Sequence, residues 1–126
     1  MGIRARHAAV WAGFALAVLL QLVVLYLPSA PEGPGIPGTD KAVHAAIFLL
    51  PALLGTLAGI PALALAGVLA AHAVLSEAVQ HLVLPDRSGD VWDVVADITG
   101  ILIGSAIAWA LLRRRARRGG APSSAA

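Results

Sequence analysis

The sequence predicts an all-α integral membrane protein, a four-helix bundle, and three observations support this. Hydrophobic residues make up 59% of the 126 positions and charged residues only 13%, and the mean hydropathy is +0.84. A soluble domain has about 25% charged residues, so this composition is too poor in charge for a water-exposed surface. The apolar residues form four long runs, with most charges beside their ends. Because the runs lack the alternation of membrane strands, helices are favoured over a barrel.

The first run, 8–27, has the roughly 20 residues that a helix needs to cross a hydrocarbon core about 30 Å thick. A cleaved signal peptide is the alternative interpretation. Its apolar core is usually only about 7 to 15 residues long, and the nearest small-residue site, Ser29 and Ala30, is flanked by prolines. The segment 28–39 contains four prolines and three glycines, so it predicts a loop.

The second and third runs predict helices over 41–58 and 62–83. Pro51 lies inside the second run, where the missing N–H and the ring of proline predict a kink. Pro61 precedes the third run and is suited to the first turn of a helix, where a missing N–H costs nothing.

The fourth run predicts a helix over 91–112, after a short loop that begins at Pro85. Five arginines follow it, and the tail 113–126 is predicted to be disordered because its end is small and polar. With 126 residues the chain forms one membrane domain, 1–126, without room for a soluble catalytic domain.

The basic residues predict the orientation, because lysine and arginine near span ends are retained in the cytoplasm. Four spans place both termini on one side. Seven of the nine basic residues then lie on the cytoplasmic side, and only Lys41 and Arg87 lie outside. The basic tail is therefore a topology signal that also attracts anionic lipid, and we expect membrane lipids as partners but no nucleic acid.

The acidic residues of the fourth run form a single stripe. Asp90, Asp93, Asp97, Gly100 and Gly104 are spaced three, four, three and four apart, which puts them on one helix face. At a rise of about 1.5 Å per residue, Asp97 lies about 10 Å deeper than Asp90. The two glycines form a small-xxx-small pair that predicts close contact with another helix.

Polar residues of the other helices are predicted to meet this stripe at the outer face. Asp40 and His44 share a face of the second helix, and Glu77 and Gln80 lie near the end of the third. Ionisable residues inside spans usually face the bundle interior and mark functional sites. The candidate ligand-binding residues are Asp40, Lys41, His44, Glu77, Gln80, Arg87, Asp93 and Asp97.

Purely structural roles are the alternatives. Asp40 and Asp90 are suited to cap helices, and Lys41 and Arg87 to neutralise carboxylates. His44 alone is typical of an interhelical hydrogen bond. His72 stands apart on its helix, so packing or a single hydrogen bond is expected there.

Three ordered motifs resemble the VanZ-like family of small bacterial membrane proteins. They are Asp40-Lys41-x-x-His44, Glu77-x-x-Gln80, and the segment from Arg87 through Asp93 and Asp97 to Gly104, with Asp97 standing where many relatives carry Asn. The resemblance covers 39–104, about half the chain. It implies a multi-pass protein of the bacterial plasma membrane and cell envelope, related to one associated with teicoplanin resistance, an antibiotic resistance against a glycopeptide. It implies no reaction.

Two classes of function follow from the residues. The first is an envelope protein whose outer cup binds a lipid or glycan head group, such as a lipid-linked or glycopeptide ligand, with Lys41 and Arg87 contacting an anion. The second is an intramembrane enzyme acting on a lipid-linked phosphate, with His44 or Glu77 as general base and Arg87 stabilising charge.

Metal binding and ion transport are further alternatives. His44, Glu77, Asp93 and Asp97 form an oxygen-rich set with one imidazole, which suits magnesium or manganese better than structural zinc. The chain has no cysteine, which excludes thiolate chemistry. Passage of protons or ions is less favoured, because the inner half of the runs is apolar apart from His72.

Overall fold

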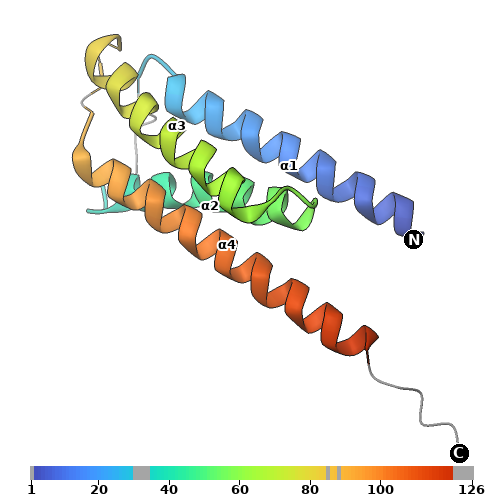
Figure 1. The fold of residues 1–126 in the computed structure, drawn as a ribbon. Coiled ribbons are helices and arrows are strands. Elements are labelled where there is room, and N and C mark those ends of the chain that lie inside the picture. Colours follow the sequence, from blue (N-terminus) through green and yellow to red (C-terminus); the bar gives the residue numbers. More distant parts are fainter. Residues whose placement is uncertain (1, 30–34, 85, 88, 121–126) are drawn as a thin grey trace, which may run out of the picture.

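The computed structural model is an up-down-up-down bundle of four helices (Figure 1). It describes residues 2–29, 35–84, 86–87 and 89–120. The helices are α1 (Ile3–Tyr26), α2 (Thr39–Leu57), α3 (Ala62–Leu82) and α4 (Val91–Gly119). Regular structure in the described residues is otherwise confined to one isolated bridge between Ser29 and Asp86. The prediction of an all-α four-helix bundle is confirmed.

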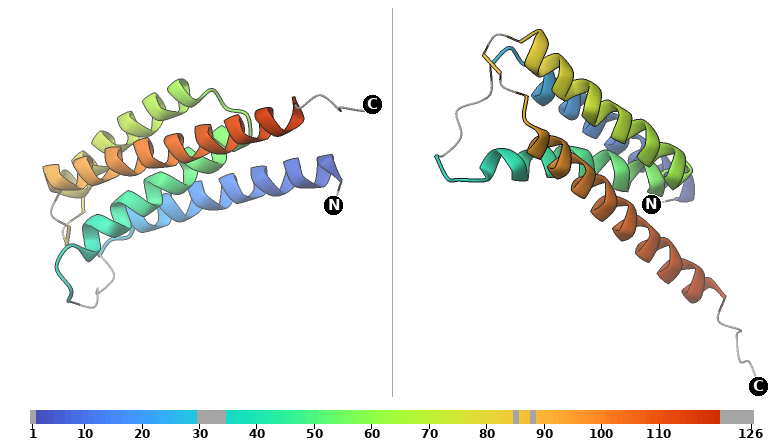
Figure 2. Two further views of the ribbon diagram at one scale, coloured as in Figure 1. Left: turned by 90° about the horizontal axis from the view of Figure 1, so that it is seen from below. Right: turned by 60° about the vertical axis from the view of Figure 1, so that its left-hand side comes forward.

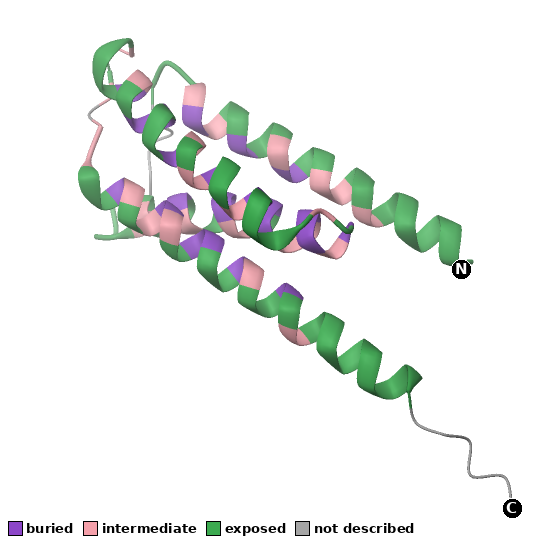
Figure 3. Cartoon of the chain, viewed as in Figure 1, coloured by how far each residue is buried: buried purple, intermediate pink, exposed green. Residues whose placement is uncertain are grey.

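Each helix is long and apolar enough to cross a membrane. The most apolar windows of α1 to α4 have mean hydropathies of 2.4, 1.4, 1.8 and 1.9. Large apolar side chains point outward, as at Leu16, Leu63 and Leu102, and Figure 3 shows exposed residues along the outer faces. Such a surface is suited to lipid rather than water. The chain is therefore a multi-pass membrane protein.

The two ends of the bundle differ in what they carry. The first and last residues of the described chain lie at one end, together with the short α2–α3 connection (Figures 1 and 2). The α1–α2 and α3–α4 connections lie at the opposite end. An even number of spans places both termini at the same end of the bundle. The arginine-rich ends of α1 and α4 are therefore separated from the acidic residues at the opposite end.

Helix α2 is the centre of the packing. It contacts all three other helices, α4 most extensively. The apolar core includes Phe48 and Ala52 of α2 and Ile101 of α4, and it extends to Leu25 of α1 and Leu69 of α3. Helix α2 continues through Pro51, which is itself buried.

The glycine pair of α4 lies directly against α2. A Cβ atom at Gly100 would overlap the backbone carbonyl of Ala45, and one at Gly104 would overlap that of Leu49. The two backbones therefore approach more closely than any side chain at these positions allows. The predicted small-xxx-small contact is confirmed, and its partner is α2.

The helix ends differ from those predicted. Helix α1 begins at Ile3 rather than at residue 8. Apart from the end of α4, the other helix ends differ from the predicted ones by at most two residues, which is within the usual uncertainty of helix boundaries. The larger correction is in α4, which continues to Gly119, so the prediction of disorder is wrong for 113–119. Hydropathy indicates which part of a helix lies in lipid, not where the helix ends. Arginine has a high helix propensity, so α4 continues through the arginines that follow its apolar run. Residues 121–126 lie outside the described part of the chain.

We expect Gly100→Ala to lower the free energy of unfolding by about 1 to 3 kcal/mol, the usual cost of overpacking a close contact. The added Cβ must push α4 away from the Ala45 carbonyl. Gly67→Ala is the matched control, because its Cβ meets nothing within 4 Å. Thermal melting in detergent measures both variants, and equal melting temperatures would contradict the close contact.

Candidate functional site

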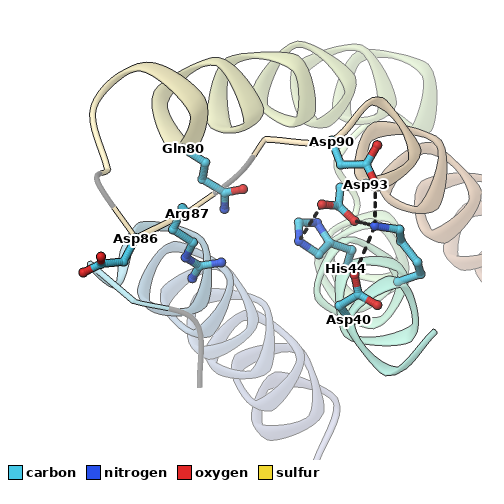
Figure 4. Close-up of a pocket in the computed structure, with 8 residues that line it drawn as sticks. Asp40, His44, Gln80, Asp86, Arg87, Asp90 and Asp93 are labelled. Carbon is cyan, nitrogen blue, oxygen red and sulfur yellow. Dashed lines mark hydrogen bonds and ion pairs between the residues drawn. The ribbon is translucent and has the colours of Figure 1, made fainter. Parts of the chain in front are cut away.

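A polar cavity of about 230 Å³ opens at the end of the bundle that carries the α1–α2 and α3–α4 connections. We call it the cup. Its walls come from the start of α2, the end of α3, the α3–α4 connection and the start of α4 (Figure 4). It is lined by Asp40, Lys41, His44, Gln80, Asp86, Arg87, Asp90 and Asp93.

Lys41 lies at the centre of the outer layer of charges, which we call the cup rim and which also contains Asp40, Asp90 and Asp93. Its Nζ donates to Asp40 Oδ2 and Asp90 Oδ2, both at 3.0 Å, and to Asp93 Oδ1. The ammonium has three donor protons, and three carboxylates accept them. The carboxylates differ in burial, with side-chain exposures of 65% for Asp40, 44% for Asp90 and 9% for Asp93. Lys41 thus joins α2 to α4 and has no ammonium proton left for another acceptor.

One helical turn deeper, a second set of charges forms the cup floor. His44 Nδ1 lies 2.9 Å from Asp97 Oδ1 and 3.8 Å from Glu77 Oε1. The three residues belong to α2, α4 and α3, and all three are buried. His44 follows Lys41 by three positions and Asp97 follows Asp93 by four, so the two α2–α4 pairs are stacked along one helical face.

Glu77 links the floor to the start of α4. Its Oε2 accepts a hydrogen bond of 2.9 Å from the backbone N–H of Asp90. Gly89 makes this possible, because a Cβ there would come within 2.7 Å of the Glu77 carbonyl oxygen and 2.8 Å of His81 Cβ. Glycine at position 89 therefore lets the backbone there pack directly against α3.

Asp90 combines two roles. It is the N-cap of α4, where its carboxylate accepts from the backbone N–H of Trp92 at 3.0 Å. This bond and the ammonium of Lys41 hold the pKa of Asp90 below its ordinary value. Asp90 was expected on the acidic stripe but was missing from the candidate ligand set. Its place in the stripe was the signal that identifies it.

Gln80 and Arg87 line the cup but direct hydrogen bonds to α1. Gln80 Nε2 donates to the Leu25 carbonyl at 2.8 Å. Arg87 donates to the carbonyls of Leu27, at 3.3 Å, and Val24. The last carbonyls of a helix lack partners within it, so these side chains satisfy the end of α1. A spatial contact of this kind leaves no local pattern in the sequence.

The structural alternatives are resolved residue by residue. Asp90 caps its helix, whereas the N-cap of α2 is Gly38 and Asp40 lies in the first turn. His72 makes the expected single hydrogen bond, with its Nε2 3.0 Å from the Tyr26 hydroxyl. Asp86 also lines the cup, although it was not among the candidate ligand-binding residues. Its signal in the sequence was its place among the acidic residues at the outer end of the bundle.

The fold and the cup together define a small multi-pass membrane protein with a polar site at one end of its bundle. Comparison with protein-family models, with curated proteins and with solved structures found no match to this chain. The chemistry of the cup is therefore the basis for assigning a function.

We expect Lys41→Met to lower the free energy of unfolding by about 1 to 3 kcal/mol, between the values for exposed and buried ion pairs. The change leaves the nearly buried Asp93 beside Asp90 without their shared cation. Asp40→Asn is the control and should cost less than about 1 kcal/mol, because this carboxylate is exposed. Equal losses in thermal or denaturant melts would contradict the role of Lys41.

Proposed function

We propose that this chain is a VanZ-like protein of the bacterial plasma membrane whose outer cup binds the polar head group of a lipid or glycan. The observation that carries this proposal is that six of the eight candidate residues line one cavity, at the level where spans end, and that the other two, Glu77 and Asp97, are buried beside His44. A site at that depth suits a ligand whose polar group lies at the membrane surface and whose apolar part remains in lipid.

The charges of the cup favour a ligand that carries hydrogen-bond donors. Four carboxylates line the cavity, and carboxylates only accept hydrogen bonds. Both basic residues are already engaged, Lys41 with three carboxylates and Arg87 with backbone carbonyls. Sugar hydroxyls or amines complement these walls better than a bare phosphate does. This changes the anion-binding role that the sequence suggested for Lys41 and Arg87.

The orientation belongs to the same proposal. The arginines near both termini favour a cytoplasmic location for that end of the bundle, which puts the cup on the cell-envelope side. Through the VanZ resemblance, the proposal extends to a glycopeptide such as teicoplanin, or the envelope lipid that it targets, as the relevant ligand chemistry.

An intramembrane enzyme acting on a lipid-linked phosphate is the second candidate, and the His44–Asp97 pair favours it. A carboxylate that holds one imidazole nitrogen leaves the other to accept a proton from a substrate. His44 lines the cup, and its Nε2 lies 3.9 Å from Asp93 Oδ2. Of the two candidates for general base, His44 is therefore better placed than Glu77, and Arg87 remains the candidate for stabilising charge.

Single-cysteine labelling tests the orientation cleanly, because the chain has no native cysteine. Ser29 is exposed at the cup end and Gly120 is exposed at the other end. We expect Ser29→Cys in whole cells to react with a membrane-impermeant maleimide, and Gly120→Cys to react only after permeabilisation. The reverse pattern would place the cup in the cytoplasm.

Native mass spectrometry of the protein extracted from bacterial membranes tests the ligand. We expect the wild type to retain a lipid or glycan with hydroxyl or amine groups. The Asp40→Asn, Asp90→Asn double variant should lose most of it, because the two more exposed of the three rim carboxylates then become neutral while Asp93 still holds Lys41. Thr99→Val is the control, since Thr99 is exposed on the outer face of α4 and bonds only within its own helix.

The same retained species in all three proteins would contradict head-group binding at the cup. His44→Gln separates the two functions in this experiment. A phosphate-containing lipid that accumulates on His44→Gln and is absent from the wild type would favour the enzyme, because the variant then retains a substrate that the wild type converts.

A further inference from the structure

The cup floor contains a second feature that head-group binding does not explain. His44, Glu77 and Asp97 each offer a nitrogen or oxygen atom, and these three atoms lie within 4.8 Å of one another. The residues come from three different helices and are buried, Asp97 completely. Such convergence requires α2, α3 and α4 to be packed, so it belongs to the folded bundle alone.

Two oxygen atoms of this cluster lack partners. Glu77 Oε1 and Asp97 Oδ2 are buried and accept no hydrogen bond from the described residues. A buried carboxylate oxygen without a hydrogen-bond donor raises the free energy of the folded protein, and the increase is larger within a membrane span. The nearest ammonium does not relieve them, since Lys41 donates to the three rim carboxylates. A positive charge at the floor would relieve both oxygens at once.

Two of the three distances within the cluster match those between ligands of one metal ion. Donor atoms bound about 2.0 to 2.2 Å from a common ion lie about 3 to 4 Å apart. His44 Nδ1 is 2.9 Å from Asp97 Oδ1 and 3.8 Å from Glu77 Oε1. His44 lines the cup, so its imidazole is accessible from outside.

We propose that His44, Glu77 and Asp97 bind a divalent cation at the cup floor, with manganese or magnesium as the class. Carboxylate oxygens favour these ions, and a single imidazole is compatible with manganese. Two carboxylates and a neutral imidazole balance the double charge of the ion, so the complete site is neutral at its depth in the bundle.

A carboxylate lies near the other ring nitrogen of His44. With Nδ1 on the metal, His44 keeps its proton on Nε2, which faces Asp93 Oδ2 at 3.9 Å. A shortening of this separation to hydrogen-bond length on metal binding would fix the tautomer and orientation of the imidazole. Asp93 also accepts from Lys41, which connects the metal floor to the rim. Water or a hydroxyl of the head group would complete the coordination of the ion.

Manganese alone tests the site, without any lipid ligand. The full chain in detergent is stripped with a chelator and titrated with Mn²⁺, and the free ion is followed by its electron paramagnetic resonance signal. We expect one bound ion per wild-type chain, displaced by excess Mg²⁺. Glu77→Gln and Asp97→Asn should each weaken binding at least tenfold, because even outer-shell changes at metal sites cost about 10 to 100-fold.

Asp86→Asn is the matched control, since it removes a cup carboxylate that does not belong to the cluster and that lies across the pocket from His44 in Figure 4. It should bind as the wild type does. Melting curves with and without Mn²⁺ show whether each variant is folded, and should show a metal-dependent rise for the wild type and Asp86→Asn only. If the Asp97→Asn variant does not fold, Mn²⁺ binding by the Glu77→Gln variant tests the site.

A wild type that leaves the free Mn²⁺ signal unchanged would overturn the metal site, and so would equal binding by the wild type and Glu77→Gln. The Asp40→Asn, Asp90→Asn variant keeps the two proposals separate. It should still bind Mn²⁺ even where it loses the head group, so failure of one proposal does not imply failure of the other.

Discussion

The close approach of α4 to α2 is the constraint on which the rest of the structure depends. Only the absence of side chains at Gly100 and Gly104 lets the α4 backbone reach the carbonyls of Ala45 and Leu49. Above this contact the same two faces continue as polar pairs, first the floor and then the rim. Glycines and charges thus form one continuous interface, in which van der Waals contact near mid-membrane sets the spacing for ionic contact near the surface.

Depth gives the two layers of charge different properties. The rim around Lys41 is partly open, so water and salt moderate its ion pairs. The floor around His44 is buried, so its electrostatic interactions act through a medium of lower dielectric constant. One acidic stripe therefore contributes both to a partly exposed rim and to a buried floor, one helical turn apart.

Much of this arrangement could be predicted from the sequence, because helical periodicity is local. The spacing of Asp93, Asp97 and Gly100 fixed their shared face before any neighbour was known. The bonds of Gln80 and Arg87 to the end of α1 could not be predicted, since backbone carbonyls carry no residue-specific signal. Nor could the floor geometry, which depends on how far each helix slides along α2. The extension of α4 past its apolar run was missed because hydropathy does not measure helicity.

The division of the polar cluster among α2, α3 and α4 has a consequence for how the protein is made. Synthesis from the N-terminus places Lys41 and His44 in the membrane before Asp93 and Asp97 have left the ribosome. The carbonyls that end α1 likewise gain Gln80 and Arg87 only after the third span has been inserted. Each early span thus carries polar groups that only later spans satisfy. The polar core is therefore complete only once α4 has packed against α2 and α3.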